Sequence, residues 1–253
     1  MLKLVAALTA AISITSASAP ALAAEKPVSI VLVHGAFVDG SGWQKVYDIL
    51  TNDGYEVIVA QNSTATLEGD VATATRAIER SKHPVVLVGH SYGGMVITEA
   101  GNNPKVRDLA YLAAFAPEAG ESVSTWLSKP EPAGYAPVPV APPQDGFLTV
   151  DIAKFPSAFA ADVDPETTRF MAASQVPWGI AAVNTKITQA AWKTKPTYFL
   201  ITTEDLMIPT PQQREMAARA HANTIEVASS HAVMLSHPDQ VASFIERIAD
   251  PAE

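Results

Sequence analysis

The sequence predicts an α/β protein built around a mostly parallel, twisted sheet with helices on both faces. Short runs of Val, Ile and Leu alternate with segments whose apolar residues recur at helical spacing, which is typical of parallel strands joined by helices. The 253 residues are 48% hydrophobic and 17% charged, enough for a sizeable core. A serine between two glycines, in Gly89-His-Ser91-Tyr-Gly93, follows one apolar run, and parallel sheets place their sites where strands end.

The alternation is regular over the first half of the chain. Apolar or β-branched residues fill each strand-like run, and the segments between them bring apolar residues to one face every three or four positions. The predicted strands are residues 29–33, 55–60, 84–88 and 106–114, and the predicted helices are residues 43–50, 71–82 and the segment after Ser91. Strands and helices alternating at this pace indicate a parallel sheet covered on both faces.

Residues 116–195 interrupt this alternation and are predicted to form a cap insertion within the same domain. The tract Lys129–Gly146 holds six prolines, which excludes a helix and favours an extended loop, either an ordered rim or a mobile lid. Residues 147–192 are predicted to form short helices carrying aromatic side chains. Strands at 196–202 and 224–228 and a closing helix from about Pro238 complete the core, which comprises residues 25–115 and 196–253.

The first 24 residues have the pattern of a secretory signal peptide. Lys3 precedes an apolar stretch from Leu4 to about Ile14, and small residues lead to Ala21-Leu-Ala-Ala24, with cleavage expected at Ala23 or Ala24. The apolar stretch is shorter than the ~20 residues that cross a bilayer. We therefore expect a periplasmic or extracellular protein with no membrane attachment once the signal is removed.

The overall composition excludes several classes of function. Asp and Glu outnumber Lys and Arg by 26 to 17, a net charge of −9, and the basic residues form no cluster, which argues against nucleic acid as a partner. The chain has no cysteine, so it has no disulfide, no thiolate metal site and no cysteine nucleophile. Nothing in the sequence implies a metal or an organic cofactor, and the oligomeric state stays open.

Ser91 is the candidate nucleophile. The pattern Gly89-x-Ser91-x-Gly93 is typical of a nucleophile elbow, a sharp strand-to-helix turn that exposes the serine hydroxyl. Glycines flank the serine because the strand and the helix pass too close for side chains. The pattern alone is common, but here it follows a predicted strand and precedes an apolar helix.

His231 is the candidate general base. A serine hydroxyl needs a base to take its proton, and the base needs a carboxylate to orient it. His231 lies in the loop after the last predicted strand, at the same edge of the sheet as Ser91. The remaining histidines have local explanations in turns, in the elbow itself or at helix ends: His34, His83, His90, His221 and His237.

Asp205 is the candidate acid. It follows the strand that precedes the histidine strand, within Thr202-Thr-Glu-Asp205-Leu-Met-Ile-Pro209, so the chain order is Ser91, Asp205, His231. A turn-forming role before the proline is the alternative for Asp205. Glu204 is the second candidate for the acid, and Glu118 is a more remote third.

Two backbone N–H groups are predicted to stabilise the oxyanion that develops on the carbonyl oxygen. Tyr92, directly after the nucleophile, supplies one, and Ala36, in the loop after the first strand, supplies the other.

Four segments together resemble the α/β-hydrolase superfamily: GHSYGG, VLVHGAF, TEDLMIP and SSHAVMLSHP. They are similar in particular to the plant methylesterase and hydroxynitrile-lyase group and its bacterial relatives. The resemblance implies an α/β-hydrolase fold with a cap at about 116–195, a triad of Ser91, Asp205 and His231, and an oxyanion hole at Ala36 and Tyr92. Lyase members of the group carry Lys after the histidine and Thr at the loop glycine, where this sequence has Ala232 and Gly35.

These features predict a secreted serine hydrolase that cleaves small to medium carboxylic esters through an acyl-enzyme. Its partner is then a small-molecule ester, and no cofactor takes part. Lactone opening or carbon–carbon bond cleavage on the same fold is one alternative. A hydrolase-like protein that binds a ligand without catalysis is the other.

Overall fold

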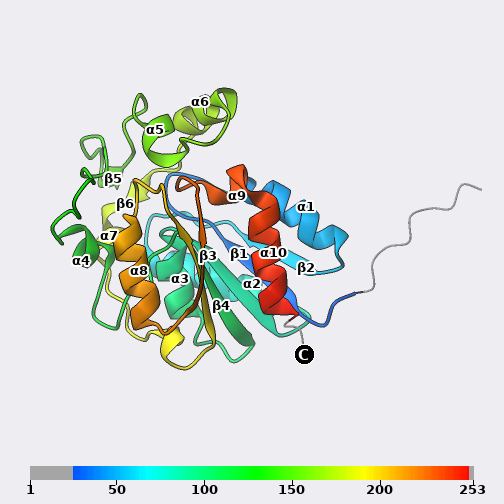
Figure 1. Ribbon diagram of the computed structural model, residues 1–253. Coiled ribbons are helices and arrows are strands. Elements are labelled where there is room, and N and C mark those ends of the chain that lie inside the picture. Colours follow the sequence, from blue (N-terminus) through cyan, green and yellow to red (C-terminus); the bar gives the residue numbers. More distant parts are fainter. Residues whose placement is uncertain (1–24, 251–253) are drawn as a thin grey trace, which may run out of the picture.

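Six parallel strands form one twisted sheet in the order β2-β1-β3-β4-β7-β8 (Figure 1). The computed structural model describes residues 25–250, and the signal peptide predicted for residues 1–24 lies outside them. All six predicted strands are present, and the predicted α/β fold class is confirmed. The strands are β1 (Ser29–Val33), β2 (Glu56–Ala60), β3 (Val85–His90), β4 (Val106–Leu112), β7 (Thr197–Thr202) and β8 (Asn223–Val227).

The sheet has its topological switch point between β1 and β3. From β1 the chain runs outward to β2 and then returns to place β3 on the other side of β1, after which the strands continue in the opposite direction. The loops that leave β1 and β3 therefore diverge, which opens a crevice at the carboxyl ends of these two strands. Ser91 directly follows β3, and Ala36 follows β1.

Helices on both faces of the sheet enclose two separate apolar cores. Alternate residues of β1 point to opposite faces, so Val31 and Val33 belong to one core and Ile30 and Leu32 to the other. One face is covered by η1 (Gly40–Trp43), α1 (Gln44–Asn52), α9 (Val233–Ser236) and α10 (Pro238–Ala249). The other face is covered by α2 (Leu67–Arg80), α3 (Gly93–Ala100) and α8 (Thr210–Arg219).

Among the element ends that differ from the sequence prediction, two have an identifiable local cause. Helix α2 begins at Leu67 rather than at residue 71, because the Thr66 side chain accepts a hydrogen bond from the Gly69 N–H and caps the helix one turn earlier. Strand β4 ends at Leu112 rather than at residue 114, because Ala113 adopts a left-handed backbone with φ 46° and turns the chain out of the sheet.

The segment between β4 and β7 contains short elements, most of them at the left and top of Figure 1, with α5 and α6 at the top. They are α4 (Val123–Leu127), β5 (Phe147–Leu148), α5 (Phe155–Phe159), α6 (Pro165–Ala173), β6 (Trp178–Gly179), α7 (Ile180–Asn184) and η2 (Ala191–Lys193). We call residues 116–195 the cap. Strands β5 and β6 form a separate antiparallel pair within it.

The proline-rich tract of the cap contacts neighbouring segments at two points along its length. Val140 forms an antiparallel bridge with Val150, which folds the second half of the tract back on the chain that follows it. Nearer its start, the Tyr135 hydroxyl accepts a hydrogen bond from the Thr210 N–H at the beginning of α8 (3.3 Å). These contacts join the tract to the chain that follows it and to α8.

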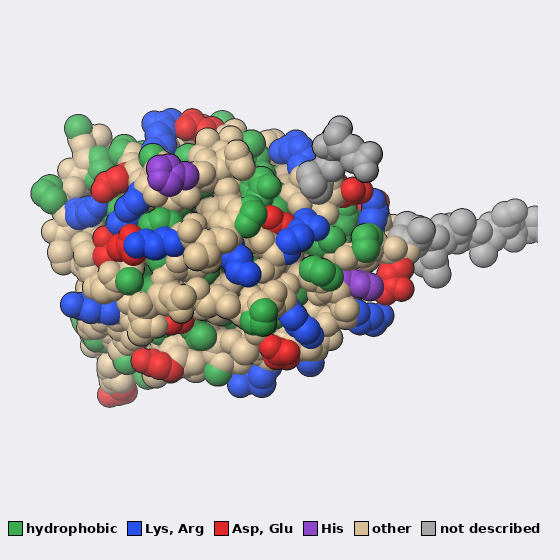
Figure 2. Space-filling model, turned by 90° about the horizontal axis from the view of Figure 1, so that it is seen from below, with side chains coloured by type: hydrophobic (Ala, Val, Ile, Leu, Met, Phe, Trp, Pro, Cys, Tyr) green, Lys and Arg blue, Asp and Glu red, His purple; other side chains and the backbone are tan. Residues whose placement is uncertain are grey.

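The surface carries charges of both signs. Figure 2 shows the molecule from below, where basic and acidic side chains are interspersed among apolar and polar ones. Surface ion pairs include Lys105 with Glu79 and Arg214 with Glu226. Among residues 25–250, no helix has the length and apolar character to span a membrane, and no three His, Asp or Glu side chains gather as a metal site.

Candidate active site

Ser91 lies at a sharp turn between β3 and α3. Its φ of 55° is in the left-handed region, which is strained for a residue with a side chain and which turns the serine out of the strand direction. Gly93 makes the turn possible, since a Cβ there would lie 2.6 Å from the Val33 carbonyl oxygen of the neighbouring strand. Ser91 is 7% exposed, so its hydroxyl lies in an enclosed site.

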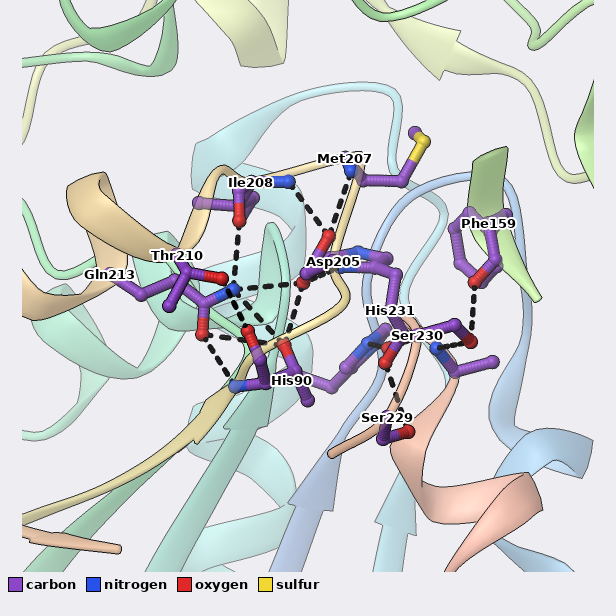
Figure 3. Close-up of polar contacts among 12 residues, drawn as sticks. His90, Phe159, Asp205, Met207, Ile208, Thr210, Gln213, Ser229, Ser230 and His231 are labelled. Atoms are coloured by element: carbon purple, nitrogen blue, oxygen red, sulfur yellow. Dashed lines mark hydrogen bonds and ion pairs between the residues drawn. The ribbon is translucent and has the colours of Figure 1, made fainter. Parts of the chain in front are cut away.

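Asp205 and His231 form a buried pair at the ends of β7 and β8 (Figure 3). His231 Nδ1 donates to Asp205 Oδ2 at 2.7 Å, and both side chains are at most 1% exposed. This bond leaves Nε2 as the nitrogen that carries a lone pair. Nε2 is buried and has no hydrogen-bond partner within the described residues. The imidazole is therefore oriented as a proton acceptor by its carboxylate.

His90, the residue before Ser91, contacts the loop that carries His231. His90 Nε2 donates to the His231 carbonyl oxygen at 2.8 Å, and the two imidazole rings lie 4.7 Å apart. Because His231 Nε2 has no hydrogen-bond partner among residues 25–250, it is not bonded to the Ser91 hydroxyl. Such catalytic bonds are often long in the free enzyme and shorten when substrate binds.

The carboxylate of Asp205 accepts five hydrogen bonds and donates none. An ionised carboxylate only accepts hydrogen bonds, so these five donors match its acceptor sites. Backbone donors bond to Oδ1 and side-chain donors bond to Oδ2, which fixes the rotation of the carboxylate group. The donors are Thr202 Oγ1 and, as seen in Figure 3, the N–H groups of Met207 and Ile208, Gln213 Nε2 and His231 Nδ1.

The other two candidate acids lie elsewhere. Glu204 is exposed, although it is next to Asp205 in the chain. Glu118 forms an ion pair with Lys193 in the cap (2.7 Å), and this bond lowers the pKa of Glu118. Of the three carboxylates considered from the sequence, the one in contact with His231 is Asp205.

The other buried histidines have structural partners. His34 bridges two loops, with Nδ1 donating to the Gly35 carbonyl (2.9 Å) and Nε2 accepting from the Asn62 N–H (2.9 Å), and burial lowers the pKa of His34. Burial, and next the His231 imidazole, hold the pKa of His90 well below 6.5. His90 thus stays neutral beside His231. His237 directly precedes α10, as the sequence indicated.

Two backbone N–H groups beside Ser91 are free to bind an oxyanion. Within residues 25–250 neither the Ala36 N–H nor the Tyr92 N–H donates to a protein acceptor. Ala36 and Ser91 line one cavity of about 50 Å³, together with apolar side chains of the core and the cap: Phe37, Phe115, Leu127, Val138, Val140, Leu148, Trp178, Met207 and Ile208. Gly35 is packed against the serine, since a Cβ on it would lie 2.6 Å from Ser91 Cβ.

The cap holds the loop that carries His231. The Phe159 ring stands edge-on to the His231 ring, with centroids 4.8 Å apart. Asp162 accepts hydrogen bonds from Ser229 Oγ (2.8 Å), from the Ser230 N–H (3.1 Å) and from Ser230 Oγ. Burial opposes ionisation of Asp162, but the bonds from Ser230 and Ser229 outweigh it, so the pKa of Asp162 is lowered.

Several residues around the site are not evident from the sequence. Gln213 and Thr202 hold Asp205, and Asp162 holds the histidine loop. Each acts through a side-chain contact that depends on the tertiary fold. The one sequence signal is at Gln213, a polar residue on the core-facing side of a helical segment.

The chain belongs to the alpha/beta hydrolase family, whose model matches residues 30–244. A pyrethroid hydrolase of Sphingobium wenxiniae is 27% identical over 88% of this chain and 89% of its own length. A carbendazim hydrolyzing esterase of a Nocardioides species is 36% identical over 41% of this chain and 49% of its own. The crystal structure of a methylesterase from Arabidopsis superposes with a TM-score of 0.71 at 18% identity, covering 87% of this chain and 98% of that one. The resemblance drawn from the sequence motifs is thereby confirmed.

Proposed function

We propose that the protein is an exported serine hydrolase that cleaves carboxylic esters of small to medium size. The observation that carries the proposal is the buried Asp205–His231 pair, in which His231 Nε2 has no hydrogen-bond partner among the described residues. The backbone of His231 accepts a hydrogen bond from His90, the residue before Ser91. The relatives named as a pyrethroid hydrolase and a carbendazim hydrolyzing esterase support ester hydrolysis as the reaction class.

In the proposed reaction, Ser91 Oγ attacks the ester carbonyl while His231 Nε2 takes its proton. The negative charge that develops on the carbonyl oxygen is met by the N–H groups of Ala36 and Tyr92. His231, held by Asp205, returns the proton to the leaving alcohol. Water then releases the acid from the acyl-enzyme by the same steps in reverse.

The cavity at Ser91 favours an ester with apolar groups. Its wall consists of aromatic and aliphatic side chains from the oxyanion loop, the cap and the loop after Asp205. Charged side chains do not contribute to this lining, so an ionised substrate group would lose its hydration there without a compensating partner. Esters of neutral alcohols with neutral acyl groups fit such a site best.

The position of Gly35 supports ester hydrolysis over cyanohydrin cleavage. In the hydroxynitrile lyases that the sequence resembles this position is Thr, and here a side chain would collide with Ser91 Cβ at 2.6 Å.

The proposal of export rests on the sequence of residues 1–24. Fractionation of cells that produce the full chain, with N-terminal sequencing of the mature protein, tests it.

The test of the function is hydrolysis of a series of p-nitrophenyl esters by the wild type and Ser91→Ala. Loss of the nucleophile is expected to lower turnover by ~10⁶-fold. A fluorophosphonate probe is expected to label the wild type and not the variant. Turnover that persists in Ser91→Ala rejects the assignment, and product analysis on lactone and β-diketone substrates separates ester hydrolysis from the alternatives.

A further inference from the structure

We infer that Asp70 is a positioning residue that acts through Tyr92 to align the oxyanion N–H and the cavity wall; the inference rests on the proposed function. Asp70 lies in the first turn of α2, outside the Ser91 cavity, and it is fully buried. A carboxylate buried in an apolar core costs free energy unless hydrogen-bond donors compensate for its lost hydration.

Four hydrogen bonds define the carboxylate. Oδ1 accepts from the Ser63 N–H (2.9 Å), the Thr64 N–H (3.1 Å) and Ser63 Oγ (3.2 Å), and Oδ2 accepts from the Tyr92 hydroxyl (2.9 Å). Burial raises the pKa of Asp70, and the bonds from Tyr92, Thr64 and Ser63 oppose the rise. Because all four partners donate, the site is complementary to the ionised form.

The bond to Tyr92 connects this carboxylate to the reaction. Tyr92 directly follows the nucleophile, and its backbone N–H is one of the two proposed oxyanion donors. The side chain of Tyr92 is fully buried, so the hydrogen bond at its hydroxyl holds the far end of the residue against α2. Rotation of the elbow would break this bond, and the backbone N–H therefore stays fixed in direction before substrate binds.

The same carboxylate also positions the cap over the site. Thr64, held by Asp70, has a left-handed backbone with φ 57°. Its hydroxyl donates to the Pro177 carbonyl (2.8 Å), and its carbonyl accepts from the Gly179 N–H (2.9 Å). Both partners belong to the cap, so the loop that Asp70 orders also fixes the backbone on either side of residue 178.

Trp178 lies between these two anchored residues and lines the Ser91 cavity. Its ring packs against the Tyr92 ring, with centroids 5.3 Å apart, and against the Phe37 ring, with centroids 5.6 Å apart. Asp70 thus fixes both the oxyanion side of the site and the indole that walls the cavity.

The test compares Asp70→Asn and Tyr92→Phe with Glu68→Gln, an exposed carboxylate on the same helix, as the matched control. In Asp70→Asn the amide oxygen keeps the bonds from Ser63 and Thr64, and its amino group, which cannot accept, replaces the acceptor of the Tyr92 hydroxyl and leaves that buried O–H without one. In Tyr92→Phe the ring and the backbone N–H remain, and only the hydroxyl is lost. Circular dichroism and thermal melting establish that each variant is folded.

The readout is the ratio of kcat for p-nitrophenyl acetate to kcat for p-nitrophenyl thionoacetate. Sulfur is a weak hydrogen-bond acceptor, so an aligned oxyanion hole favours the oxygen ester and a misaligned one loses that preference. We expect kcat for the oxygen ester to fall by about 10- to 100-fold in both variants, the ratio to fall with it, and Glu68→Gln to match the wild type.

A ratio that stays at the wild-type value in the folded variants overturns the inference, whatever the loss of turnover, because a general structural defect lowers both rates alike. If Asp70→Asn does not fold, Tyr92→Phe decides by the same criterion. A wild type without ester turnover instead overturns the proposed function, and the inference with it.

Discussion

Replacing Asp205 by Asn is expected to lower kcat by ~10⁴-fold, because the amide imposes the wrong imidazole tautomer on His231. The two backbone donors at Oδ1, from Met207 and Ile208, cannot turn away, so the amide oxygen takes that side. The amino group then faces His231 Nδ1, which must become an acceptor. Its proton moves to Nε2, the atom that has to receive the proton of Ser91.

The cost in stability follows from the same geometry. Of the remaining donors at Oδ2, the Thr202 hydroxyl can rotate toward Gln213 Oε1 (3.4 Å), and Gln213 Nε2 keeps two acceptors, Thr202 Oγ1 (3.0 Å) and the Ile208 carbonyl (2.8 Å). What is lost is the bond from Gln213 to a charged oxygen, a cost of about 1.5–3 kcal/mol. For a chain of this size each kcal/mol lowers the melting temperature by roughly 2–4 °C.

The assay is p-nitrophenyl acetate hydrolysis at pH 8, with fluorophosphonate labelling and thermal melting on the same samples. Glu204→Gln is the matched control, since Glu204 is adjacent in the chain but exposed. The reasoning is refuted if Asp205→Asn keeps its turnover within about tenfold of the wild type while Glu204→Gln loses it, because the acid would then be Glu204.

Three further outcomes are expected. Gly35→Ala lowers turnover by about 100-fold, because its Cβ would lie 2.6 Å from Ser91 Cβ and displace the nucleophile; steady-state kinetics measures this. His90→Gln weakens the pH dependence of stability. Burial holds the pKa of His90 below 6.5, so the contribution of His90 to the free energy of unfolding is complete above pH 6.5 and is lost by up to about 1.4 kcal/mol per pH unit as pH falls. Urea unfolding at pH 7, 6 and 5 measures this. Phe37→Ala removes the ring that packs on Trp178 and raises kcat/KM for naphthyl over methyl esters by about tenfold.

Each of these outcomes has a control. Gly42→Ala controls for Gly35, because a Cβ at Gly42 meets no atom within 4 Å, and equal losses in the two variants would contradict the steric argument. For His90, an unchanged slope of stability against pH in the glutamine variant would assign the acid sensitivity to other groups. An unchanged ester preference in Phe37→Ala would show that this ring does not limit the cavity.

The sequence was sufficient for the architecture because local and global signals agree in this chain. Most strands are rich in apolar and β-branched residues and each predicted helix has one apolar face, so the approximate positions of these strands and helices followed from periodicity. The ends shifted where a single residue decides the boundary, as Thr66 does by capping α2 and Ala113 by its left-handed turn.

The candidate site was accessible from the sequence to the extent that strand ends determine it. Ser91, Asp205 and His231 each follow a strand, and parallel strands end at one edge of the sheet. The supporting residues around them were not accessible, because Asp70 bonds to Tyr92 and Asp162 bonds to Ser229 across 22 and 67 positions of the chain. Such contacts depend on side-chain packing that periodicity does not describe.

Asp162 and Phe159 have a consequence for engineering this enzyme. Both belong to the cap, yet one anchors the loop before His231 and the other packs on its imidazole. Grafting a foreign cap to change substrate range would therefore also release the proposed catalytic base, His231. Chimeras that retain residues 155–162 and exchange only the proline-rich rim keep that support, and they are the designs in which specificity can change without loss of the acid–base machinery.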